Sequence, residues 1–282
     1  MALKERLDVL LVKKNYFPSP ERARRAVMAG KVFVEGKLVD KPGVLINPQA
    51  LIIVEEKEEF VSRGGEKLKK ALLEFGVKVE NLTVLDTGAS TGGFTEVLLK
   101  HGARQVIAVD VGYGVLAWKL RQDARVFVLE RTNIRYLEPE KLPELADLVT
   151  ADLSFISLKK VVPNLKRLTK PEASFILLVK PQFETGREKV EKGGLVKNPR
   201  VHEEVLLDLC RFFQDESLAV EGITYSPITG ADGNIEFFVY LRKGEEKRTK
   251  DEELKQKISR VVGEAHCEFG SRPKGRPLQD KT

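Results

Sequence analysis

The feature that most constrains the fold is a regular alternation of short apolar segments with helical segments between residues 65 and 242. The apolar segments are TVLDTGA, QVIAVDV, RVFVLE, DLVTAD, SFILLV, LAVEGITY and NIEFFVYLR. This alternation predicts an α/β domain with a mostly parallel, doubly wound sheet of seven strands. Little chain separates the last two segments, so we expect them to pair antiparallel at one edge. Residues 65–243 are therefore predicted to form one Rossmann-like domain.

The composition excludes several classes of protein. A chain of 282 residues with 42% hydrophobic and 32% charged residues is long enough for one large and one small globular domain. It has no apolar run of the roughly 20 residues that a membrane span needs, and charges interrupt the N-terminal segment. Cys210 and Cys267 lie far apart, and the histidines are scattered, which argues against a metal site and for a reducing compartment. We expect a cytoplasmic protein without a metal or a membrane partner.

The positive charge is concentrated in the first part of the chain. Residues 1–54 hold ten Lys or Arg against five acidic residues, whereas the run EEKEEFVS that follows is acidic. A basic small region beside a nearly neutral large one indicates a polyanion-binding module attached to another domain. We therefore predict a small α+β domain over residues 1–58, a linker over 59–64, the Rossmann-like domain over 65–243, and a charged, partly disordered tail over 244–282 with a helix near 251–263.

Residues 1–58 have the pattern of two short helices followed by strands. The first helix is expected over residues 6–14, and Ser19-Pro20 is typical of an N-cap before a second helix that runs through Ala29. KVFVEGKLV predicts a hairpin with its turn at Glu35-Gly36, and LIIV predicts a further strand. The second helix exposes its arginines, which fit either a solvated helix face or a set of phosphate contacts.

The order and residues of this region resemble the S-four type RNA-binding domain, which is named after a small-subunit ribosomal protein. The pattern RLDVLLVKKNYFPSPERARRAVMAGKVFVEGKLVDKPGVLI carries the resemblance across residues 4–55. The resemblance implies that the basic side chains bind RNA. The predicted RNA-binding residues are Arg6, Arg22, Arg25, Lys31 and, at the start of the large domain, Arg63.

A glycine-rich loop follows the first predicted strand of the large domain. Asp86 lies in that strand, and the loop TGASTGGF opens a helix, so backbone N–H groups can approach a ligand closely. The next strand ends in Asp110, where a carboxylate can hold two ribose hydroxyls. The residues predicted to bind a cofactor are Asp86, Gly88, Ala89, Ser90, Thr91, Gly92, Gly93, Asp110, Val111 and Asp152.

Three interpretations fit this loop: an NAD site, an S-adenosylmethionine site, or an ordinary glycine turn with a capping acid. The spacing D-x-G-x-S-x-G-G differs from the dinucleotide fingerprint G-x-G-x-x-G and contains no phosphate-loop lysine. In TADLSFISL, Asp152 ends the fourth strand with a phenylalanine behind it. An acid and an aromatic side chain there suit a methyl donor with an acceptor nucleotide alongside. We therefore expect S-adenosyl-L-methionine as the cofactor.

Four charged residues fall at element boundaries that meet at one crevice in a doubly wound sheet. Lys67 lies at the start of a helix in SRGGEKL, and Asp152 ends the fourth strand. Lys180 ends the fifth strand, and Glu236 begins the last strand in GNIEFF. Each of them alone could be a solvated charge. Two lysines and two acids at one crevice together predict a catalytic cluster.

The segments SRGGEKL, LDTGASTGGFTEVLL, DVGYG, ERTNIR, DLSFISL, VKPQFE and GNIEFF together resemble the TlyA (hemolysin A) family of rRNA methyltransferases, within the FtsJ/RrmJ-like ribose 2′-O-methyltransferases. The resemblance covers nearly all of residues 1–242. It implies a class I methyltransferase domain, methyl transfer to cytidine 2′-hydroxyls in rRNA, and rRNA or ribosomal subunits as partners, and it implies no particular oligomer. It also implies a Lys-Asp-Lys-Glu tetrad, which falls on Lys67, Asp152, Lys180 and Glu236.

The chemistry of ribose methylation fits this cluster. A ribose hydroxyl must lose its proton as the methyl group arrives, and an ordinary lysine, with a pKa of ~10.4, is almost wholly protonated at neutral pH. We expect Lys180 to act as the base or to orient the hydroxyl. Lys67 and Glu236 are expected to orient Lys180 and the ribose, with Asp152 nearest the donor methyl.

Three other functions are compatible with parts of the sequence. Methylation of a base amino group usually involves a D/N-P-P-Y motif after the fourth strand, and D-L-S-F lacks those prolines. A non-catalytic RNA-binding or assembly factor would have no use for the glycine loop and Asp110. A membrane-lytic role, which the name hemolysin suggests, has neither an apolar span nor a basic amphipathic helix to support it. We therefore favour 2′-O-methylation.

Overall fold

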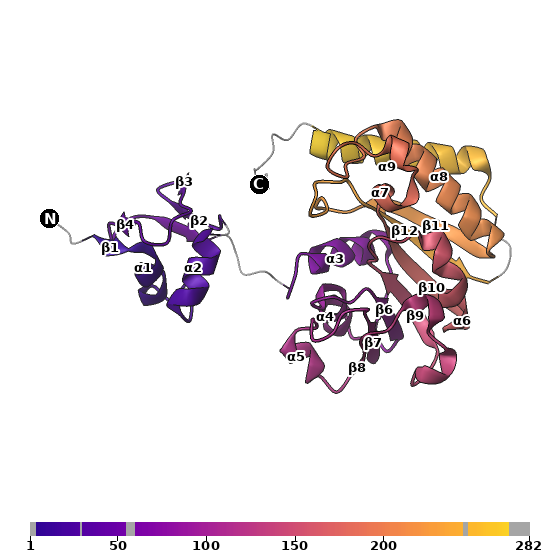
Figure 1. Ribbon diagram of the computed structural model, residues 1–282, viewed down its shortest axis with the longest axis horizontal. Helices are drawn as coiled ribbons and strands as arrows, with labels where there is room; N and C mark the ends of the chain where they lie inside the picture. The colour runs from indigo at the N-terminus through magenta and orange to yellow at the C-terminus, as the bar shows by residue number, and fades with distance from the viewer. Residues whose placement is uncertain (1–3, 29, 55–59, 245–247, 271–282) are drawn as a thin grey trace. The chain divides into compact units, whose positions relative to one another are not determined.

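The computed structural model describes residues 4–28, 30–54, 60–244 and 248–270 of the chain (Figure 1). They belong to two compact units, Met1–Glu59 and Phe60–Thr282. Each unit has its own hydrophobic core. The two units are therefore described separately.

The first unit contains two helices and short antiparallel strands, as predicted. The leucines of helix α1 lie on one face of the helix and are buried there. They pack against Ala23 and Val27, two small residues of α2. The hairpin turn lies at Glu35 and Gly36, both with positive φ, which matches the twist of a tight antiparallel hairpin. The elements are β1 (Glu5–Arg6), α1 (Leu7–Lys13), α2 (Pro20–Met28), β2 (Val32–Val34), β3 (Lys37–Leu38), β4 (Leu45–Ile46) and β5 (Ile52–Val54).

The second unit is built on a seven-stranded sheet in the order β11-β12-β10-β9-β6-β7-β8. The strands from β10 to β8 are parallel, whereas β12 runs antiparallel to both of its neighbours, which confirms the predicted pairing of the last two strands. The strands are β6 (Thr83–Thr87), β7 (Gln105–Val109), β8 (Val126–Leu129), β9 (Ala146–Ala151), β10 (Thr169–Val179), β11 (Leu218–Tyr225) and β12 (Phe237–Lys243). The helices are α3 (Gly64–Phe75), α4 (Gly93–Lys100), α5 (Trp118–Arg121), α6 (Val162–Arg167), α7 (Pro181–Glu184), α8 (Pro199–Asp215) and α9 (Asp251–Gly270), with single 3₁₀ turns η1 (Ile134–Tyr136), η2 (Pro139–Lys141), η3 (Leu158–Lys160) and η4 (Arg187–Lys189).

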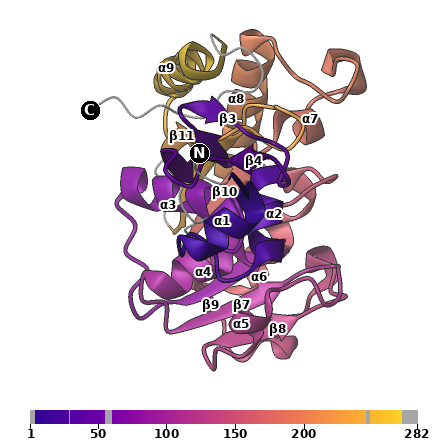
Figure 2. The same cartoon turned by 90° about the vertical axis from the view of Figure 1, so that its left-hand side faces the viewer.

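Both faces of this sheet are covered by helices (Figures 1 and 2). The central strands are rich in apolar residues because neighbouring residues point to opposite faces, and both faces are buried. In β6, for example, Val84 packs in the core with α3, α4 and α5, while Leu85 packs in the core with α6, α8 and α9. The architecture is thus the doubly wound α/β sandwich that the sequence predicts.

The strand register brings the ends of four strands together. Ala151 at the end of β9 pairs with Thr87 of β6 on one side and with Leu177 of β10 on the other. Val179, the last residue of β10, pairs with Phe237, the first residue of β12. The residues that follow β6, β9 and β10, and the residue that precedes β12, therefore leave the sheet at the same edge.

The region after β12 contains more structure than the sequence suggested. We expected a charged tail with a short helix, and the structure has the 20-residue helix α9. Its apolar residues Leu254, Ile258, Val262 and Ala265 are buried in the core beside α8. Within the described ranges, no helix is long and apolar enough to cross a membrane. The predicted disorder of the last residues falls on 271–282, outside the described part of the chain.

Candidate active site

A cavity of ≈370 Å³ opens at the edge of the sheet where β6, β9 and β10 end. Its size lies in the range of small-molecule sites. Two kinds of residue meet in it: the glycine loop that follows β6, and charged side chains from separate elements. The lining residues are Ser62, Arg63, Gly64, Lys67, Gly88, Ala89, Ser90, Thr91, Gly93, Phe94, Asp152, Ser154, Lys180, Ala231 and Glu236.

All four residues of the predicted tetrad line this cavity and form a chain of ion pairs. Lys67 Nζ lies 2.6 Å from Glu236 Oε2 and 3.9 Å from Asp152 Oδ2. Lys180 Nζ lies 2.6 Å from Asp152 Oδ1. The four residues come from α3 and from the ends of β9, β10 and β12, so the strand register described above is what brings them together.

Two members of the tetrad, Lys67 and Glu236, are buried, the other two are partly buried, and the four charges balance. The exposed fractions of the side chains are 11% for Lys67 and Lys180, 21% for Asp152 and 3% for Glu236. Burial raises the pKa of Glu236, and the ammonium of Lys67 counteracts that rise. Two ammonium groups and two carboxylates can share a poorly solvated site because each charge has a partner. Removing one of the four would leave a buried charge uncompensated.

Lys180 has a second partner that the sequence analysis did not identify. Its Nζ donates a hydrogen bond of 2.9 Å to Ser154 Oγ, and Ser154 also lines the cavity. The next residue, Phe155, is 90% exposed and has a φ of 63°. The centroid of its ring lies 5.0 Å from the centroid of the Phe183 ring. The loops after β9 and β10 therefore carry both the charged pair and an aromatic pair.

The glycine loop is shaped by close packing. Gly88 has φ of 78°, and a Cβ there would collide with the backbone oxygen of Asp152. A Cβ on Gly93 would collide with Ser62 Oγ and lie 2.9 Å from the backbone nitrogen of Gly65. We predicted that glycine would let the backbone approach a ligand. The structure adds that Gly88 and Gly93 allow the loop to pack against the loop after β9 and against the start of α3.

Four of the residues predicted to bind the cofactor are not among those that line the cavity: Asp86, Gly92, Asp110 and Val111. Asp86 is fully buried beneath the loop, where it accepts hydrogen bonds from Thr95 and Thr150, and burial raises its pKa to about 6. Asp110 accepts hydrogen bonds from the backbone N–H groups of Ser90 and Gly112, at 2.8 and 2.7 Å. Val111 is exposed. Asp110 therefore supports the glycine loop from the end of β7.

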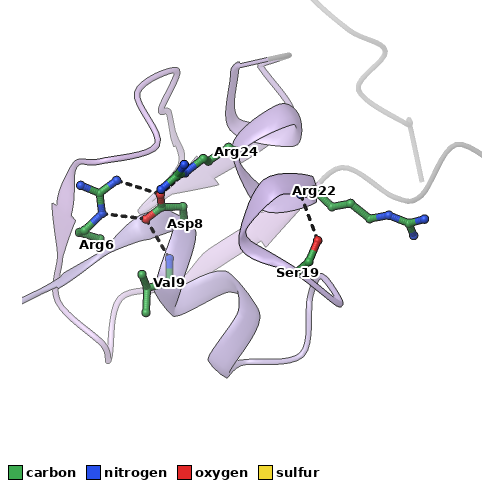
Figure 3. A network of polar contacts seen from close by, with 6 residues as sticks. All are labelled: Arg6, Asp8, Val9, Ser19, Arg22 and Arg24. Carbon is green, nitrogen blue, oxygen red and sulfur yellow. Dashed lines mark hydrogen bonds and ion pairs between the residues drawn. The ribbon is translucent and has the colours of Figure 1, made fainter.

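The residues predicted to bind RNA are distributed over both units. Arg63 is exposed, precedes α3 and lines the cavity. Arg6 pairs with Asp8, Arg25 pairs with Glu21, and the side chain of Arg22 extends outward (Figure 3). Lys31 follows α2 and is half-buried.

Several lining residues were missed by sequence reasoning: Ser62, Gly64, Phe94, Ser154 and Ala231. Ser154 had a signal, because it lies two residues after the predicted Asp152. Ser62 and Gly64 fall in the segment 59–64, which we predicted to be a linker. The structure places residues 60–64 in the second unit, where Phe60 is buried against α3. The described residues contain no group of three or more His, Cys, Asp or Glu side chains arranged to hold a metal ion.

Comparison with known protein families assigns both units. Residues 60–243 match the FtsJ-like methyltransferase family, and residues 5–52 match the S4 domain. A solved structure from Streptococcus thermophilus that carries a provisional hemolysin name is 43% identical and superposes with a TM-score of 0.76, covering 96% of this chain and 98% of that one. These matches confirm the α/β methyltransferase fold and the N-terminal RNA-binding type of domain.

Curated relatives match along almost their whole length. The 16S/23S rRNA (cytidine-2'-O)-methyltransferase TlyA of Mycobacterium tuberculosis (strain ATCC 25618 / H37Rv) is 43% identical over 266 residues, covering 94% of this chain and 99% of the relative. Hemolysin A of Brachyspira hyodysenteriae is 40% identical over 237 residues, covering 84% of this chain and 99% of the relative. The chain therefore belongs to the TlyA family, within the FtsJ-like methyltransferases.

Proposed function

We propose that this protein is an S-adenosylmethionine-dependent rRNA (cytidine-2′-O)-methyltransferase that activates or orients the ribose hydroxyl with Lys67, Asp152, Lys180 and Glu236. One observation carries the proposal: the glycine loop and the tetrad line the same cavity, where Asp152 packs against Gly88 and pairs with both lysines. The relative from Mycobacterium tuberculosis bears the name of this activity on both 16S and 23S rRNA. The S4 domain match supports RNA as the partner.

The lining residues fit a cofactor of this kind. When bound, S-adenosylmethionine supplies a methyl group on a positively charged sulfur. We assign Gly88, Ala89, Ser90 and Thr91 to the donor side of the cavity because they form the turn between β6 and α4, where backbone groups face a ligand. Asp110, which holds Ser90 in place, is proposed to reach the ribose of the donor. The carboxylate of Asp152 would then lie between the donor and the acceptor.

Lys180 is placed to handle the acceptor hydroxyl. An ammonium group has three N–H donors, and within the described residues Asp152 and Ser154 take two of them. We assign the remaining position on Nζ to the 2′-oxygen of the ribose. Transfer replaces the O–H bond with an O–CH₃ bond, so the proton must leave. Either Lys180 in its neutral amine form accepts this proton on the nitrogen lone pair, or its ammonium form orients the hydroxyl while solvent accepts the proton.

Lys67 and Glu236 hold the other end of the cluster. Their ion pair joins α3 to the start of β12 across 169 residues of sequence. Lys67 also reaches Asp152, so the pair limits how far Asp152 can turn away from Lys180. Fixing the reacting groups in this way can supply a large part of the rate, because a small misplacement is costly.

Substitution of Lys180 tests the proposal. Lys180→Ala should bind donor and rRNA nearly as the wild type does but transfer methyl at least ~100-fold more slowly, the usual scale for losing a general base. Lys180→Arg should not restore the rate if Lys180 accepts the proton, because a guanidinium stays protonated. A large recovery by arginine would assign Lys180 to orientation alone.

The control is Lys189→Ala, which removes an exposed lysine that pairs with Glu204 away from the cavity. We expect unchanged methyl transfer from this variant. Donor affinity is measured by calorimetry and transfer by incorporation of labelled methyl into rRNA. Near-normal turnover by Lys180→Ala would contradict the assignment of the tetrad.

A further inference from the structure

A buried carboxylate in the first unit accepts hydrogen bonds from two arginines and lies between them (Figure 3). Asp8 is 0% exposed and lies at the start of α1. Its Oδ2 accepts hydrogen bonds from Arg6 Nη2 at 2.9 Å and from Arg24 Nε at 2.8 Å. Its Oδ1 accepts hydrogen bonds from Arg6 Nε at 3.1 Å and from the backbone of Val9 at 3.0 Å. Both guanidinium groups are thus fixed to one oxygen atom.

The charges of this group do not cancel. One carboxylate meets two guanidinium groups, so the group carries an excess positive charge. The side chains of Arg6 and Arg24 are 50% and 56% exposed, so this charge lies at the surface. A guanidinium has five N–H donors, and Asp8 engages two on Arg6 and one on Arg24. The outer edges of both groups can still donate to an anion.

The neighbouring arginines of α2 are held differently. Arg25 pairs with Glu21 at 2.6 Å, and both side chains are about three-quarters exposed, at 76% and 74%. The charge of Arg25 is therefore balanced by a solvated partner, and such pairs fix a side chain weakly. Arg22 extends outward, and its hydrogen bond to Ser19 comes from the backbone (Figure 3). Within α2, Arg24 is the arginine that a buried group positions.

We propose that Arg6 and Arg24, held by Asp8, form a binding seat for one backbone phosphate of the RNA. The inference rests on the proposed function, which makes RNA the substrate, and it adds Arg24 as a contact and Asp8 as the residue that positions both arginines. Two planar guanidinium groups presented together match the oxygens of a phosphate. Because Asp8 already orders both side chains, less conformational freedom is lost when the phosphate binds.

The state of Asp8 agrees with this role. The hydrogen bond from Arg6, followed by the contacts with Arg24, holds the pKa of Asp8 well below its usual range despite burial. Asp8 is therefore ionised wherever the protein is folded near neutral pH. The positions of both arginines then depend on a charge that does not titrate in the working range.

Two charge-defined variants test the seat. Asp8→Asn removes the acceptor charge and raises the net charge of the protein by one. If overall charge alone governed RNA binding, this variant would bind a 23S rRNA transcript more tightly. The seat predicts the opposite, a dissociation constant about tenfold higher, because the two arginines lose their common anchor. Arg24→Lys keeps the charge and should weaken binding by a similar factor, because a lysine cannot present the guanidinium fork.

The control is Lys13→Arg, a charge-preserving change on α1 at a residue that pairs with the partly exposed Glu5. Its affinity for the transcript should match the wild type. Binding is measured by filter retention at several salt concentrations, with circular dichroism to show that each variant is folded. Arg24→Lys keeps a cation beside Asp8, so it tests the seat even if Asp8→Asn does not fold.

Unchanged affinity of Arg24→Lys, or tighter binding by folded Asp8→Asn, would overturn the seat. In either case, wild-type methylation of the same transcript would show that the proposed function still holds. A wild-type protein that neither binds nor methylates rRNA would overturn both. Donor affinity should be the same in all variants, because the seat lies in the first unit and the donor cavity in the second.

Discussion

At the scale of single residues, Phe155 has the most exposed large apolar side chain within the described ranges. It is 90% exposed, and its φ of 63° is an unfavourable backbone conformation for a bulky residue. It lies three residues after Asp152, and Phe183 lies three residues after Lys180. A strained, exposed aromatic beside a candidate acceptor site fits a surface on which a nucleobase stacks.

We predict that Phe155→Gly separates stability from activity. Glycine adopts the left-handed conformation without strain, so the midpoint of thermal unfolding should rise or stay the same. Loss of a stacking surface should lower kcat/KM for rRNA by about tenfold or more, since stacking of one base on an aromatic ring is worth ~1–3 kcal/mol. Donor affinity should not change.

The matched control is Leu73→Ala, which shortens an exposed apolar side chain on α3 that does not line the cavity. Steady-state methylation and thermal unfolding are measured on both variants. Unchanged kcat/KM in Phe155→Gly would remove Phe155 from the acceptor site. A large loss in Leu73→Ala would show that the assay reports general surface effects.

Residues of the candidate site were predictable from the sequence where a charged residue directly follows an apolar segment. Lys180 follows the apolar run FILLV, and Asp152 follows a mostly apolar strand, so the sequence alone singles them out. Lys67 and Glu236 were singled out partly by family resemblance, because a charge at a helix start or an edge strand is common. Ser154 was missed because its contact with Lys180 joins two loops 26 residues apart in sequence, and serine is frequent in any loop.

At the scale of elements, Glu184 links the two loops that carry the charged pair. It ends α7, and its carboxylate accepts hydrogen bonds from Ser157 Oγ at 2.6 Å and from the backbone of Leu158 at 2.8 Å. Burial raises the pKa of Glu184. The contact ties the segment after β10 to the segment after β9, so it limits relative movement of Lys180 and Asp152.

A second link between elements joins α8 and α9 through two histidines. His202 Nδ1 lies 3.0 Å from His266 Nε2, and His202 Nε2 lies 3.0 Å from the backbone oxygen of Val196. Burial, followed by the nearby His266, lowers the pKa of His202 to about 4. Burial also lowers the pKa of His266. The packing of α9 therefore requires uncharged imidazoles.

We predict that His202 lowers the free energy of unfolding as the pH drops from 7 to 5, whereas Asp86, whose pKa is raised, acts in the opposite direction. Between the unfolded pKa, ~6.5, and the folded value of about 4, unfolded His202 binds a proton that the folded protein does not. The contribution of His202 to the free energy of unfolding is therefore fully present above the unfolded pKa. It is lost as the pH falls toward the folded pKa, by at most ~1.4 kcal/mol per pH unit for one histidine. Urea unfolding at pH 7 and at pH 5 measures the free energy of unfolding.

The comparison variant is His202→Gln, which cannot take up a proton at this position. Between pH 7 and pH 5 its unfolding free energy should fall less than that of the wild type, even if it is less stable at pH 7. Equal pH dependence in the wild type and His202→Gln would show that the histidine pair does not couple folding to protonation.

Helices and strands were predictable where their apolar residues follow a clear pattern. Helix α9 has a weaker pattern, and its full length was not predicted. The central strands of the second unit are mostly apolar because both faces of the sheet are buried, so their composition marks them. Helix α9 begins with three acidic residues and lies in a segment rich in charge, which is the pattern of a solvated tail. Its apolar residues are buried only because they pack against apolar residues of α8, about 50 residues earlier in the chain.

At the scale of the whole molecule, the chain combines two units with separate cores. The first has the S4 type of fold and holds arginines on a buried carboxylate, and the second is a methyltransferase domain with a charged cavity. The composition already indicated this division, because the excess positive charge lies in residues 1–54. We therefore propose that the first unit binds RNA and that the second unit transfers the methyl group.

The chemical identity of the product tests this account most directly. Full-length protein is incubated with 16S and 23S rRNA and S-adenosylmethionine that carries a deuterated methyl group, and the RNA is digested to nucleosides for mass spectrometry. We predict the label in 2′-O-methylcytidine, with labelling at least ~100-fold slower when Lys180→Ala replaces the wild type. Label in a base-methylated nucleoside, or no labelled nucleoside from the wild type, would contradict it.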